Sequence, residues 1–417
     1  MNIYFSGIGG VGIGPLAEIA RDAGYSVQGS DAQRGPILDR LEQSGVRVST
    51  DQTGLFLEEC NTEKPVDWFV YTAALPENHP ELVLAQTLGI RTAKRDELLS
   101  TIIADKGLQL IAIAGTHGKT TTTGMMVWTL QQLGIPVSYS VGTTLSFGPS
   151  GHYEPGSQYF VYECDEFDRN FLAFSPHLTL ITSVDYDHPD TYPTEADYTD
   201  AFKDFIRQSS ATIIWQNDAD YLETREPSMW CLQQDEVLDI PLPGEHNRRN
   251  ATLVYKALER LGIGSDFGNQ AAIASFPGTD RRFEKLGKNL YSDYGHHPVE
   301  IAATLQLARE ISDHIVLVYQ PHQNTRQHEI RDQYTDCFTQ ADIVYWLPTY
   351  LSREDPNLET LSPEQLTERL SNREAVTIAD MNDDLWQKIQ AHRSENHLVL
   401  CMGAGSIDAW MRQRLAA

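Results

Sequence analysis

Apolar and polar positions along the chain form blocks that predict strands followed by helices. Short apolar runs, such as 108–114, are bounded by glycine-rich turns and polar residues, which is typical of buried strands. Stretches with apolar residues at helical spacing follow several of these runs, as at 15–23, 125–133 and 299–310. Strands that alternate with helices indicate parallel sheets covered by helices. The predicted fold class is therefore α/β.

This strand–turn–helix pattern starts three times along the 417 residues, a length that allows two or three domains. The first block ends at a polar break around 104–106. The second begins with the strand at 108–114 and ends after a loop predicted at 264–268, and the third begins near 276. We predict three domains, at 1–106, 107–275 and 276–417.

The composition narrows the class of protein further. The formal net charge of −26 argues against binding to nucleic acid or to an anionic membrane. No apolar run reaches the length of a membrane span, and the N-terminus lacks the pattern of a signal peptide. The five cysteines are scattered without a CxxC motif, as expected in a reducing compartment. We expect a cytoplasmic protein, monomeric or weakly dimeric, with small-molecule partners.

The sequence at 115–123, GTHGKTTTT, lies between a predicted strand and a predicted helix. A glycine-rich turn in that position directs backbone N–H groups and a helix N-terminus at one point, which favours phosphate. Lys119 adds positive charge, and the Thr120 hydroxyl can ligate Mg²⁺. The spacing departs from the usual phosphate loop, because Ile113 stands where the first glycine belongs and Gly115 opens the turn. The segment predicts a phosphate-binding loop.

A second glycine-rich turn, GIGGVG at 7–12, follows the first predicted strand and opens a helix. The acidic Asp31 comes about twenty residues later, where a dinucleotide-binding fold contacts a ribose. Taken alone, this pattern predicts an NAD-dependent dehydrogenase. The same turn serves any nucleotide diphosphate, with the acid holding a sugar or a base. The alternatives of NAD, another nucleotide, or a turn with no ligand stay open at this point.

Acidic residues follow two strands of the middle block, at the strand ends where open parallel sheets bind ligands. Glu163 ends one apolar run and is a plausible Mg²⁺ ligand, since Mg²⁺ prefers oxygen. His188 follows the next run and is a less usual ligand, being a softer nitrogen donor. Capping or solvation explains the remaining acids equally well. These are Asp165, Glu166, Asp187 and Asp190.

Three further clusters carry polar side chains. His246 and Asn250 lie on one side of a helix start and could bind a purine or a sugar, although an N-cap cluster is the simpler explanation. The sequences SDYGHHP at 292–298 and QPHQNTR at 320–326 follow consecutive strands, which predicts one face of a site. Neither has the spacing of a closed metal site, and single histidines are often structural.

These motifs together resemble the Mur ligases of peptidoglycan synthesis, over nearly the whole chain. In chain order they are GxGxxG with Ser-Asp, GTHGKTTTT, ExDE, DHxD, HNxxN, RRF, DYGHHP and PHxxTR. Members that join L-alanine to the carboxylate of UDP-N-acetylmuramate match best. The resemblance implies an N-terminal Rossmann-like domain for the UDP-sugar rather than NAD. It also implies a central ATPase-like domain for ATP and a C-terminal Rossmann-like domain for the amino acid.

The resemblance also implies roles for individual residues. The ATP-binding residues would be Gly115, Thr116, His117, Gly118, Lys119, Thr120, Thr121, His246, Asn250, Arg282 and Asp293. The Mg²⁺ ligands would be Thr120, Glu163 and His188, and the catalytic residues Lys119, Glu163, His188 and His296. The UDP-sugar end would involve Gly9, Gly12, Ser30, Asp31, Thr72, Ala73 and Arg95. Tyr294, His296, Gln323 and Arg326 would surround the amino acid.

The implied reaction uses ATP to activate a carboxylate. The muramyl carboxylate attacks the γ-phosphate and becomes an acyl phosphate, while Mg²⁺ and Lys119 offset the crowded negative charge. The neutral amine of L-alanine then displaces phosphate and leaves an amide. His296 is a candidate to orient the amine.

Two positions depart from the family pattern. Gln323 stands where the alanine-adding members carry an arginine that grips the amino-acid carboxylate. Lys203 lies at the distance at which sister ligases carry a carbamylated lysine, although a solvated helix lysine explains it better. Other functions therefore stay open: a recycling ligase that attaches a tripeptide or another amino acid, an NAD-dependent dehydrogenase, and a non-catalytic nucleotide-binding protein.

Overall fold

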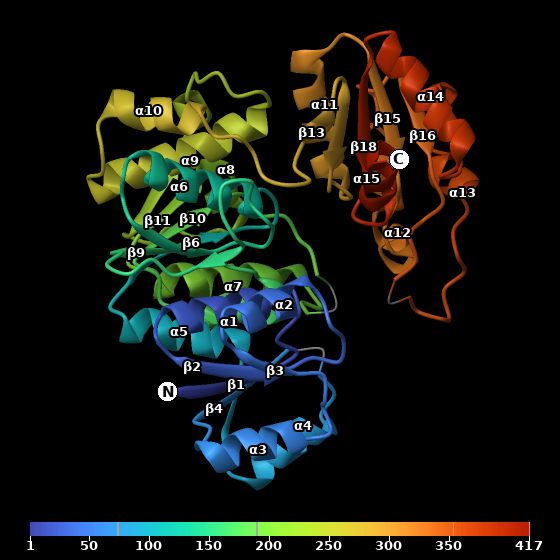
Figure 1. Ribbon diagram of the computed structural model, residues 1–417. Helices are drawn as coiled ribbons and strands as arrows, with labels where there is room; N and C mark the ends of the chain where they lie inside the picture. Colours follow the sequence, from blue (N-terminus) through green and yellow to red (C-terminus); the bar gives the residue numbers. More distant parts are fainter. Residues whose placement is uncertain (73–74, 189–190, 353, 417) are drawn as a thin grey trace. The chain divides into compact units, whose positions relative to one another are not determined.

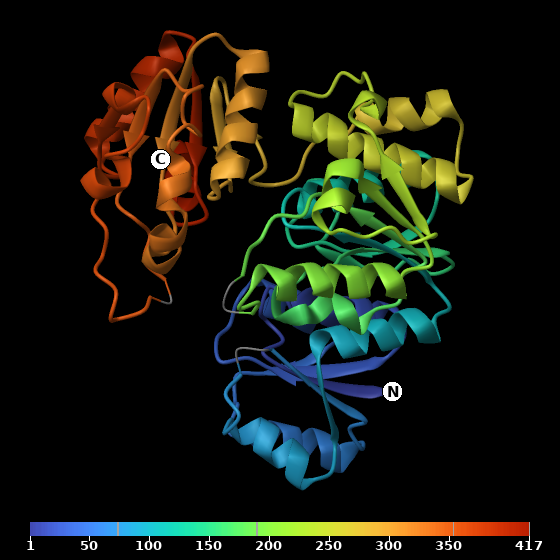
Figure 2. The same ribbon diagram turned by 180° about the vertical axis from the view of Figure 1, so that it is seen from behind.

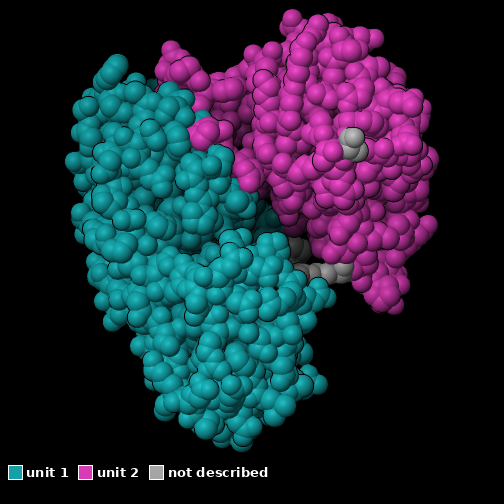
Figure 3. Space-filling view, viewed as in Figure 1, with its two compact units in different colours: residues 1–236, 252–276 teal, residues 237–251, 277–417 magenta. Residues whose placement is uncertain are grey.

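Figure 1 shows the computed structural model, which describes residues 1–72, 75–188, 191–352 and 354–416. The chain forms two compact units, coloured separately in Figure 3. Unit 1 comprises Met1–Glu236 and Thr252–Phe276, and unit 2 comprises Val237–Ala251 and Pro277–Ala417. Unit 1 contains two sheets and unit 2 contains one. The α/β class with three mainly parallel sheets is confirmed. The domain boundaries at 106 and 275 stay a prediction.

The first sheet of unit 1 is entirely parallel, in the order β3-β2-β1-β4-β5. The strand order reverses between β1 and β4, and such a switch point opens a crevice for ligands at the carboxyl ends of the strands. The glycine turn at 7–12 follows β1 at this crevice. The elements are β1 (Asn2–Ser6), α1 (Gly14–Asp22), β2 (Ser26–Ser30), α2 (Pro36–Gln43), β3 (Arg47–Ser49), α3 (Leu55–Glu63), β4 (Trp68–Tyr71), α4 (Pro80–Thr87), β5 (Arg91–Lys94) and α5 (Arg95–Asp105).

The second sheet of unit 1 has the order β12-β11-β10-β6-β9-β7-β8, with β8 antiparallel at its edge. Its central strand β6 is apolar and almost fully buried, and the phosphate loop follows it directly. The elements are β6 (Gln109–Ala114), α6 (Lys119–Gln132), β7 (Val137–Ser140), β8 (Gly151–His152), β9 (Tyr159–Glu163), η1 (Phe167–Ala173), β10 (Leu178–Ile181), α7 (Glu195–Gln208), β11 (Thr212–Trp215), α8 (Gln216–Tyr221), β12 (Met229–Leu232), η2 (Gln234–Glu236), α9 (Glu245–Leu261) and α10 (Asp266–Ala274).

One hydrophobic core cluster extends across both sheets of unit 1. It contains Phe5 of the first sheet, Phe160 of the second, and Leu16, Leu98 and Phe202 of the helices α1, α5 and α7. These helices lie between the two sheets in both views (Figures 1 and 2). The glycine turn and the phosphate loop are therefore held by the same packed core.

The sheet of unit 2 has the order β13-β14-β18-β15-β16-β17, parallel except for β13. Apolar clusters cover both of its faces. The elements are β13 (Glu284–Gly287), β14 (Leu290–Asp293), α11 (Pro298–Ile311), β15 (Ile315–Tyr319), α12 (Asn324–Ile330), η3 (Arg331–Tyr334), β16 (Ile343–Trp346), α13 (Pro363–Thr367), η4 (Arg373–Ala375), β17 (Val376–Ile378), α14 (Asp383–Ser394), β18 (Leu398–Met402) and α15 (Ile407–Ala416).

Two predicted elements were wrong in their bounds. The helix predicted at 125–133 begins six residues earlier, at Lys119, because the threonines continue the helix and the Thr122 and Thr123 hydroxyls bond back to backbone carbonyls one turn before them. The loop predicted at 264–268 contains the start of α10, which the Ser265 side chain caps. Within the described residues, none of the helices combines the length and apolar composition that a membrane span requires.

Candidate active site

The phosphate loop is a tight turn fixed against the end of β10. Gly115 has φ 131° and Gly118 has φ 83°, conformations that favour glycine. A Cβ on Gly115 would lie 2.4 Å from the Thr182 hydroxyl, so no larger residue fits. The Thr116 N–H donates to the carbonyl of Ser183 at 2.9 Å, and the His117 N–H donates to the Ser183 hydroxyl at 3.0 Å. The neighbouring strand thus holds the loop in its shape.

Lys119 is the first residue of α6, and its ammonium group is buried against Glu166. The Nζ atom donates to both carboxylate oxygens of Glu166, at 2.8 and 3.0 Å, and to the Gly115 carbonyl at 2.6 Å. Burial by itself would lower the pKa of Lys119, but the surrounding carboxylates, Glu166 first among them, outweigh it and raise that pKa. Lys119 is therefore a permanent cation at the mouth of the loop.

Thr120 and Glu163 form an oxygen pair beside this cation. The Thr120 hydroxyl donates to one Glu163 oxygen at 2.7 Å, and the Gly142 N–H donates to the other at 2.7 Å. The two side chains come from α6 and from the end of β9. A hydroxyl and a carboxylate at a phosphate loop are the hard donors that suit Mg²⁺, so the residues fit this ion.

His188 lies near the same Glu166 carboxylate that pairs with Lys119. Its Nε2 atom is 3.8 Å from a Glu166 oxygen, and its ring contacts that of Phe167 edge-on. Glu166 thus contacts both Lys119 and His188. The sequence motifs had not assigned a role to Glu166. Asp190 and Ala73 lie outside the described residues. The Lys203 ammonium pairs with Asp200 at 3.0 Å on α7, and the Lys203 side chain is 22% exposed.

The glycine turn after β1 contacts the carboxylate of Asp31. The Gly9 N–H donates to Asp31 at 2.9 Å, and a Cβ on Gly9 would lie 3.0 Å from that carboxylate. Thr72 packs against Gly7 in the same way, and the Arg95 guanidinium packs against Gly12. The expected residues at this end therefore gather around one turn.

The Ser30 side chain is fully buried and turned away from solvent. Its hydroxyl donates to Glu81 at 2.8 Å. Glu81 is itself fully buried and accepts from Ser6 at 2.6 Å and from Tyr4 at 2.5 Å. This carboxylate ties β1, β2 and α4 together behind the glycine turn, and no sequence motif indicated it.

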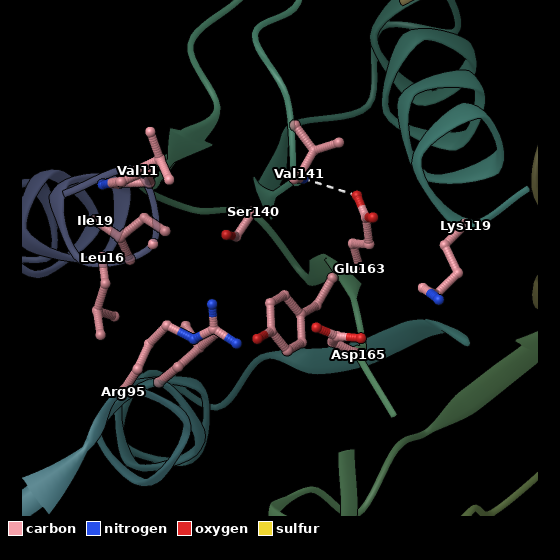
Figure 4. Close-up of a pocket in the computed structure, with 14 residues that line it drawn as sticks. Val11, Leu16, Ile19, Arg95, Lys119, Ser140, Val141, Glu163 and Asp165 are labelled. Carbon is pink, nitrogen blue, oxygen red and sulfur yellow. Dashed lines mark hydrogen bonds between the residues drawn. The ribbon is translucent and has the colours of Figure 1, made fainter. Parts of the chain in front are cut away.

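One pocket connects the glycine turn with the phosphate loop (Figure 4). Gly12 and Arg95 line it on the side of the first sheet, and Lys119 and Glu163 line it on the side of the second. In Figure 4 the two cations lie on opposite sides, with Glu163 and Asp165 between them. All of these residues belong to unit 1.

Unit 2 carries a second group of predicted residues, around the ends of β14 and β15. Asp293 ends β14, and its oxygens accept from the N–H groups of Gly295 at 2.7 Å and Phe283 at 2.8 Å. Burial raises the pKa of Asp293 to about 6. Arg281 and Arg282 lie over the ring of Tyr294 at 4.5 and 5.3 Å, which places two cations beside that ring.

His296 is a neutral, oriented imidazole. Burial lowers its pKa to about 4. The guanidinium of Arg326 can only donate, so the His296 Nε2 atom, 2.6 Å away, accepts. The Nδ1 atom then carries the proton and faces the Tyr294 carbonyl at 3.2 Å. His296 thus holds Arg326, and two residues predicted near the amino acid lie in direct contact.

Gln323 is the N-cap residue of α12 and has an unusual backbone conformation, with φ 59°. Its N–H donates to the Tyr350 carbonyl at 2.8 Å, which fixes the backbone there. The neighbouring His322 ring stacks on Tyr350 and lies edge-on to His296. Gln323 and Arg326 are therefore both near the start of one short helix, with His296 against it.

His246 and Asn250 lie in the first part of α9, which belongs to unit 2. Burial lowers the pKa of His246 to about 4, so its ring is neutral. Arg248 in the same turn forms two hydrogen bonds to Glu310 of α11, at 2.8 and 2.9 Å. The bonds from Arg248 lower the pKa of Glu310 to about 2, although burial acts in the opposite direction. The pair fixes the start of α9 against α11 of unit 2.

Comparison with known proteins identifies the family to which the chain belongs. Three domain models match the chain: the catalytic domain of the Mur ligase family at 2–106, the Mur ligase middle domain at 113–228, and the glutamate ligase domain of Mur ligases at 281–405. The UDP-N-acetylmuramate–L-alanine ligase of Jannaschia sp. strain CCS1 is 31% identical, over 98% of this chain and 94% of the relative. The chain belongs to the Mur ligase family.

Solved structures support the same fold for this Mur ligase. The UDP-N-acetylmuramate–alanine ligase MurC of Thermotoga maritima has a TM-score of 0.77 at 24% identity, over 100% of this chain and 98% of that one. A murein peptide ligase of Psychrobacter arcticus has a TM-score of 0.63 at 24% identity, over 100% and 98%. Both likenesses concern the fold alone.

Sequence reasoning missed two side chains in this Mur ligase. Glu166 was one of several acids after a strand, and only its pairing with Lys119, 47 residues away, distinguishes it. Glu81 begins a helix, and its partners lie 51 to 77 residues away. Buried carboxylates need partners, but the sequence analysis predicted neither the burial of these two glutamates nor their partners.

Proposed function

We propose that this Mur ligase joins the carboxylate of UDP-N-acetylmuramate to L-alanine at the expense of ATP. The observation that carries the proposal is the pocket between Gly12 and Lys119. A nucleotide diphosphate on the glycine turn would place its attached sugar acid in the same pocket as the outer phosphate of ATP on the loop. An NAD-dependent dehydrogenase would not use the phosphate loop. Membership of the Mur ligase family also argues against a dehydrogenase.

The first half of the reaction belongs to unit 1. A carboxylate resists an amine because its negative charge repels the nucleophile, so it is first converted into an acyl phosphate by attack on the γ-phosphate. The Lys119 ammonium stabilises the charge that gathers on the transferring phosphoryl group. Arg95, across the pocket, offers a second cation for the acid of the sugar.

Thr120 and Glu163 would hold a Mg²⁺ ion beside the phosphates, with His188 as a further candidate ligand. The ion would supply charge neutralisation for the outer phosphates of ATP. Glu166 is positioned to hold Lys119 and to contact His188, so its carboxylate would keep the cation and the imidazole in place.

The second half of the reaction concerns unit 2. The amine of the amino acid attacks the acyl carbon, and phosphate leaves with one of the original carboxylate oxygens. Arg326, held by the neutral imidazole of His296, is a suitable partner for the amino-acid carboxylate. Four further residues of unit 2 are proposed to bind ATP: Asp293, Arg282, His246 and Asn250.

Phosphate release from ATP tests this proposal directly. The assay contains UDP-N-acetylmuramate and one amine at a time: L-alanine, other L-amino acids, and the tripeptide L-alanyl-γ-D-glutamyl-meso-diaminopimelate. We expect release that depends on both the UDP-sugar and L-alanine. Release with the tripeptide alone would identify a recycling ligase, and no release with any amine would refute the ligase assignment.

We expect Gln323 to bind the carboxylate of L-alanine more weakly than an arginine would at this position. In Gln323→Arg we expect the KM for L-alanine to fall about tenfold, because one hydrogen bond between charged groups contributes about 1.5 kcal/mol or more. Initial rates of phosphate release against L-alanine concentration measure this. Gln132→Arg, on the exposed end of α6, is the matched control and should leave the KM unchanged. An unchanged KM in Gln323→Arg would remove Gln323 from the amino-acid site.

A further inference from the structure

The sheet of unit 2 has polar clusters at both ends of its strands. The predicted site residues follow the carboxyl ends of β14 and β15, at Asp293 and Gln323. At the opposite ends, His397 precedes β18 and His314 precedes β15. Each of these strands has five residues and spans about 16 Å, since a strand rises about 3.3 Å per residue. The histidines at the amino ends are therefore separate from the predicted amino-acid site.

Three potential metal ligands converge at this amino end. The Nδ1 atoms of His392 and His397 are 3.3 Å apart, and a Glu395 oxygen is 3.8 Å from the His397 Nδ1 atom. The ligand atoms all lie within 4.8 Å of one another. In the part of the chain that the structure describes, no other group of three or more His, Cys, Asp or Glu side chains meets this condition.

The two imidazole rings are arranged as ligands would be. Facing ring nitrogens can share at most one proton, so at least one lone pair points into the space between them. The other nitrogen of His392 lies 3.0 Å from the Tyr345 hydroxyl. A histidine that binds a metal through one nitrogen usually makes such a hydrogen bond through the other, which fixes its orientation.

The electrostatic surroundings favour a cation. His392 lies in the last turn of α14, where the helix dipole attracts positive charge. Glu395 supplies a full negative charge, and its side chain is 63% exposed, so the position is open to solvent.

We propose that His392, Glu395 and His397 bind a divalent transition-metal ion of the zinc type. Two imidazoles and one carboxylate suit zinc, cobalt or nickel, whereas Mg²⁺ prefers a set made of oxygen alone. Water would complete the coordination. The ion would connect the end of α14 to the start of β18, and so stabilise unit 2.

Zinc binding to the full-length protein tests the site. The protein is dialysed against Zn²⁺ in excess Mg²⁺ without nucleotide, and bound zinc and the melting temperature are measured. We expect one zinc per chain and a higher melting temperature for the wild type. For His397→Gln we expect binding weaker by at least about tenfold, because even the loss of a group that merely supports a ligand costs 10- to 100-fold.

Two further variants keep the test decisive. His177→Gln removes an exposed histidine of unit 1 and should bind zinc like the wild type. Glu395→Gln changes an exposed side chain, so it should fold normally yet bind zinc more weakly, even if His397→Gln does not fold. Phosphate release without zinc should be unchanged in Glu395→Gln. Absence of zinc from the wild type, or a zinc affinity in Glu395→Gln and His397→Gln that equals the wild-type affinity, would overturn the proposal.

Discussion

Replacing Lys119 by methionine is expected to lower the kcat of phosphate release by about 10²–10³-fold, the effect of losing one group that stabilises charge in the transition state. The Lys119 ammonium is the cation fixed at the phosphate loop, and a methionine of similar length keeps the volume of the side chain. The measurement is the steady-state rate with saturating ATP, UDP-N-acetylmuramate and L-alanine. Lys388→Met, which removes an exposed lysine that pairs with Asp384 on α14, is the matched control and should retain full activity.

Loss of stability must be separated from loss of catalysis in this variant. Without Lys119, the buried Glu166 has lost its counter-ion, which costs about 3–5 kcal/mol of folding free energy if the carboxylate stays charged. The double variant Lys119→Met/Glu166→Gln removes both charges and should recover most of that stability while staying inactive. Recovery of activity in the double variant would show that Lys119 acts on the fold and not on ATP.

The second large effect is expected for Glu163→Gln. The amide keeps an acceptor for the Thr120 hydroxyl but loses the negative charge, and its NH₂ group faces the Gly142 N–H. We expect kcat to fall about 10²-fold or more, as for other lost electrostatic contacts to the transition state. We also expect the Mg²⁺ concentration that gives half-maximal rate to rise. A titration of the rate with Mg²⁺ measures both quantities.

Glu154→Gln provides the control for this substitution. Glu154 is a partly exposed glutamate of the same sheet region, paired with His152, and its replacement should change neither the rate nor the Mg²⁺ dependence. If Glu163→Gln required no more Mg²⁺ than the wild type, Glu163 would not be a ligand, and the donor set proposed around Thr120 would be wrong.

Much of the fold could be predicted because its signals are local. The apolar run at 108–114 became the buried strand β6, and the turn after it has the two left-handed glycines that the motif required. The start of α6 was missed because threonines have low helix propensity and interrupt the apolar periodicity. The threonine hydroxyls donate hydrogen bonds to carbonyls within the helix, which offsets the low helix propensity. A pattern of residue types does not reveal these bonds.

The missing parts of the site depend on contacts between distant segments. Glu166 acquires its position from Lys119 and His188, and Glu81 from the first two strands. The Arg248–Glu310 pair, 62 residues apart, fixes the start of α9 against α11, although the rest of α9 belongs to unit 1. Such pairs follow from the path of the chain in space, which local patterns do not specify.

Activation of the sugar acid by phosphorylation in the pocket of unit 1 can be tested by following one oxygen atom. UDP-N-acetylmuramate labelled with ¹⁸O in its carboxylate is incubated with the enzyme, ATP and L-alanine, and the released phosphate is analysed by mass spectrometry. Attack of the carboxylate on the γ-phosphate, followed by displacement by the amine, predicts one labelled oxygen in each phosphate released. Phosphate released together with the amide product but without label would contradict the account.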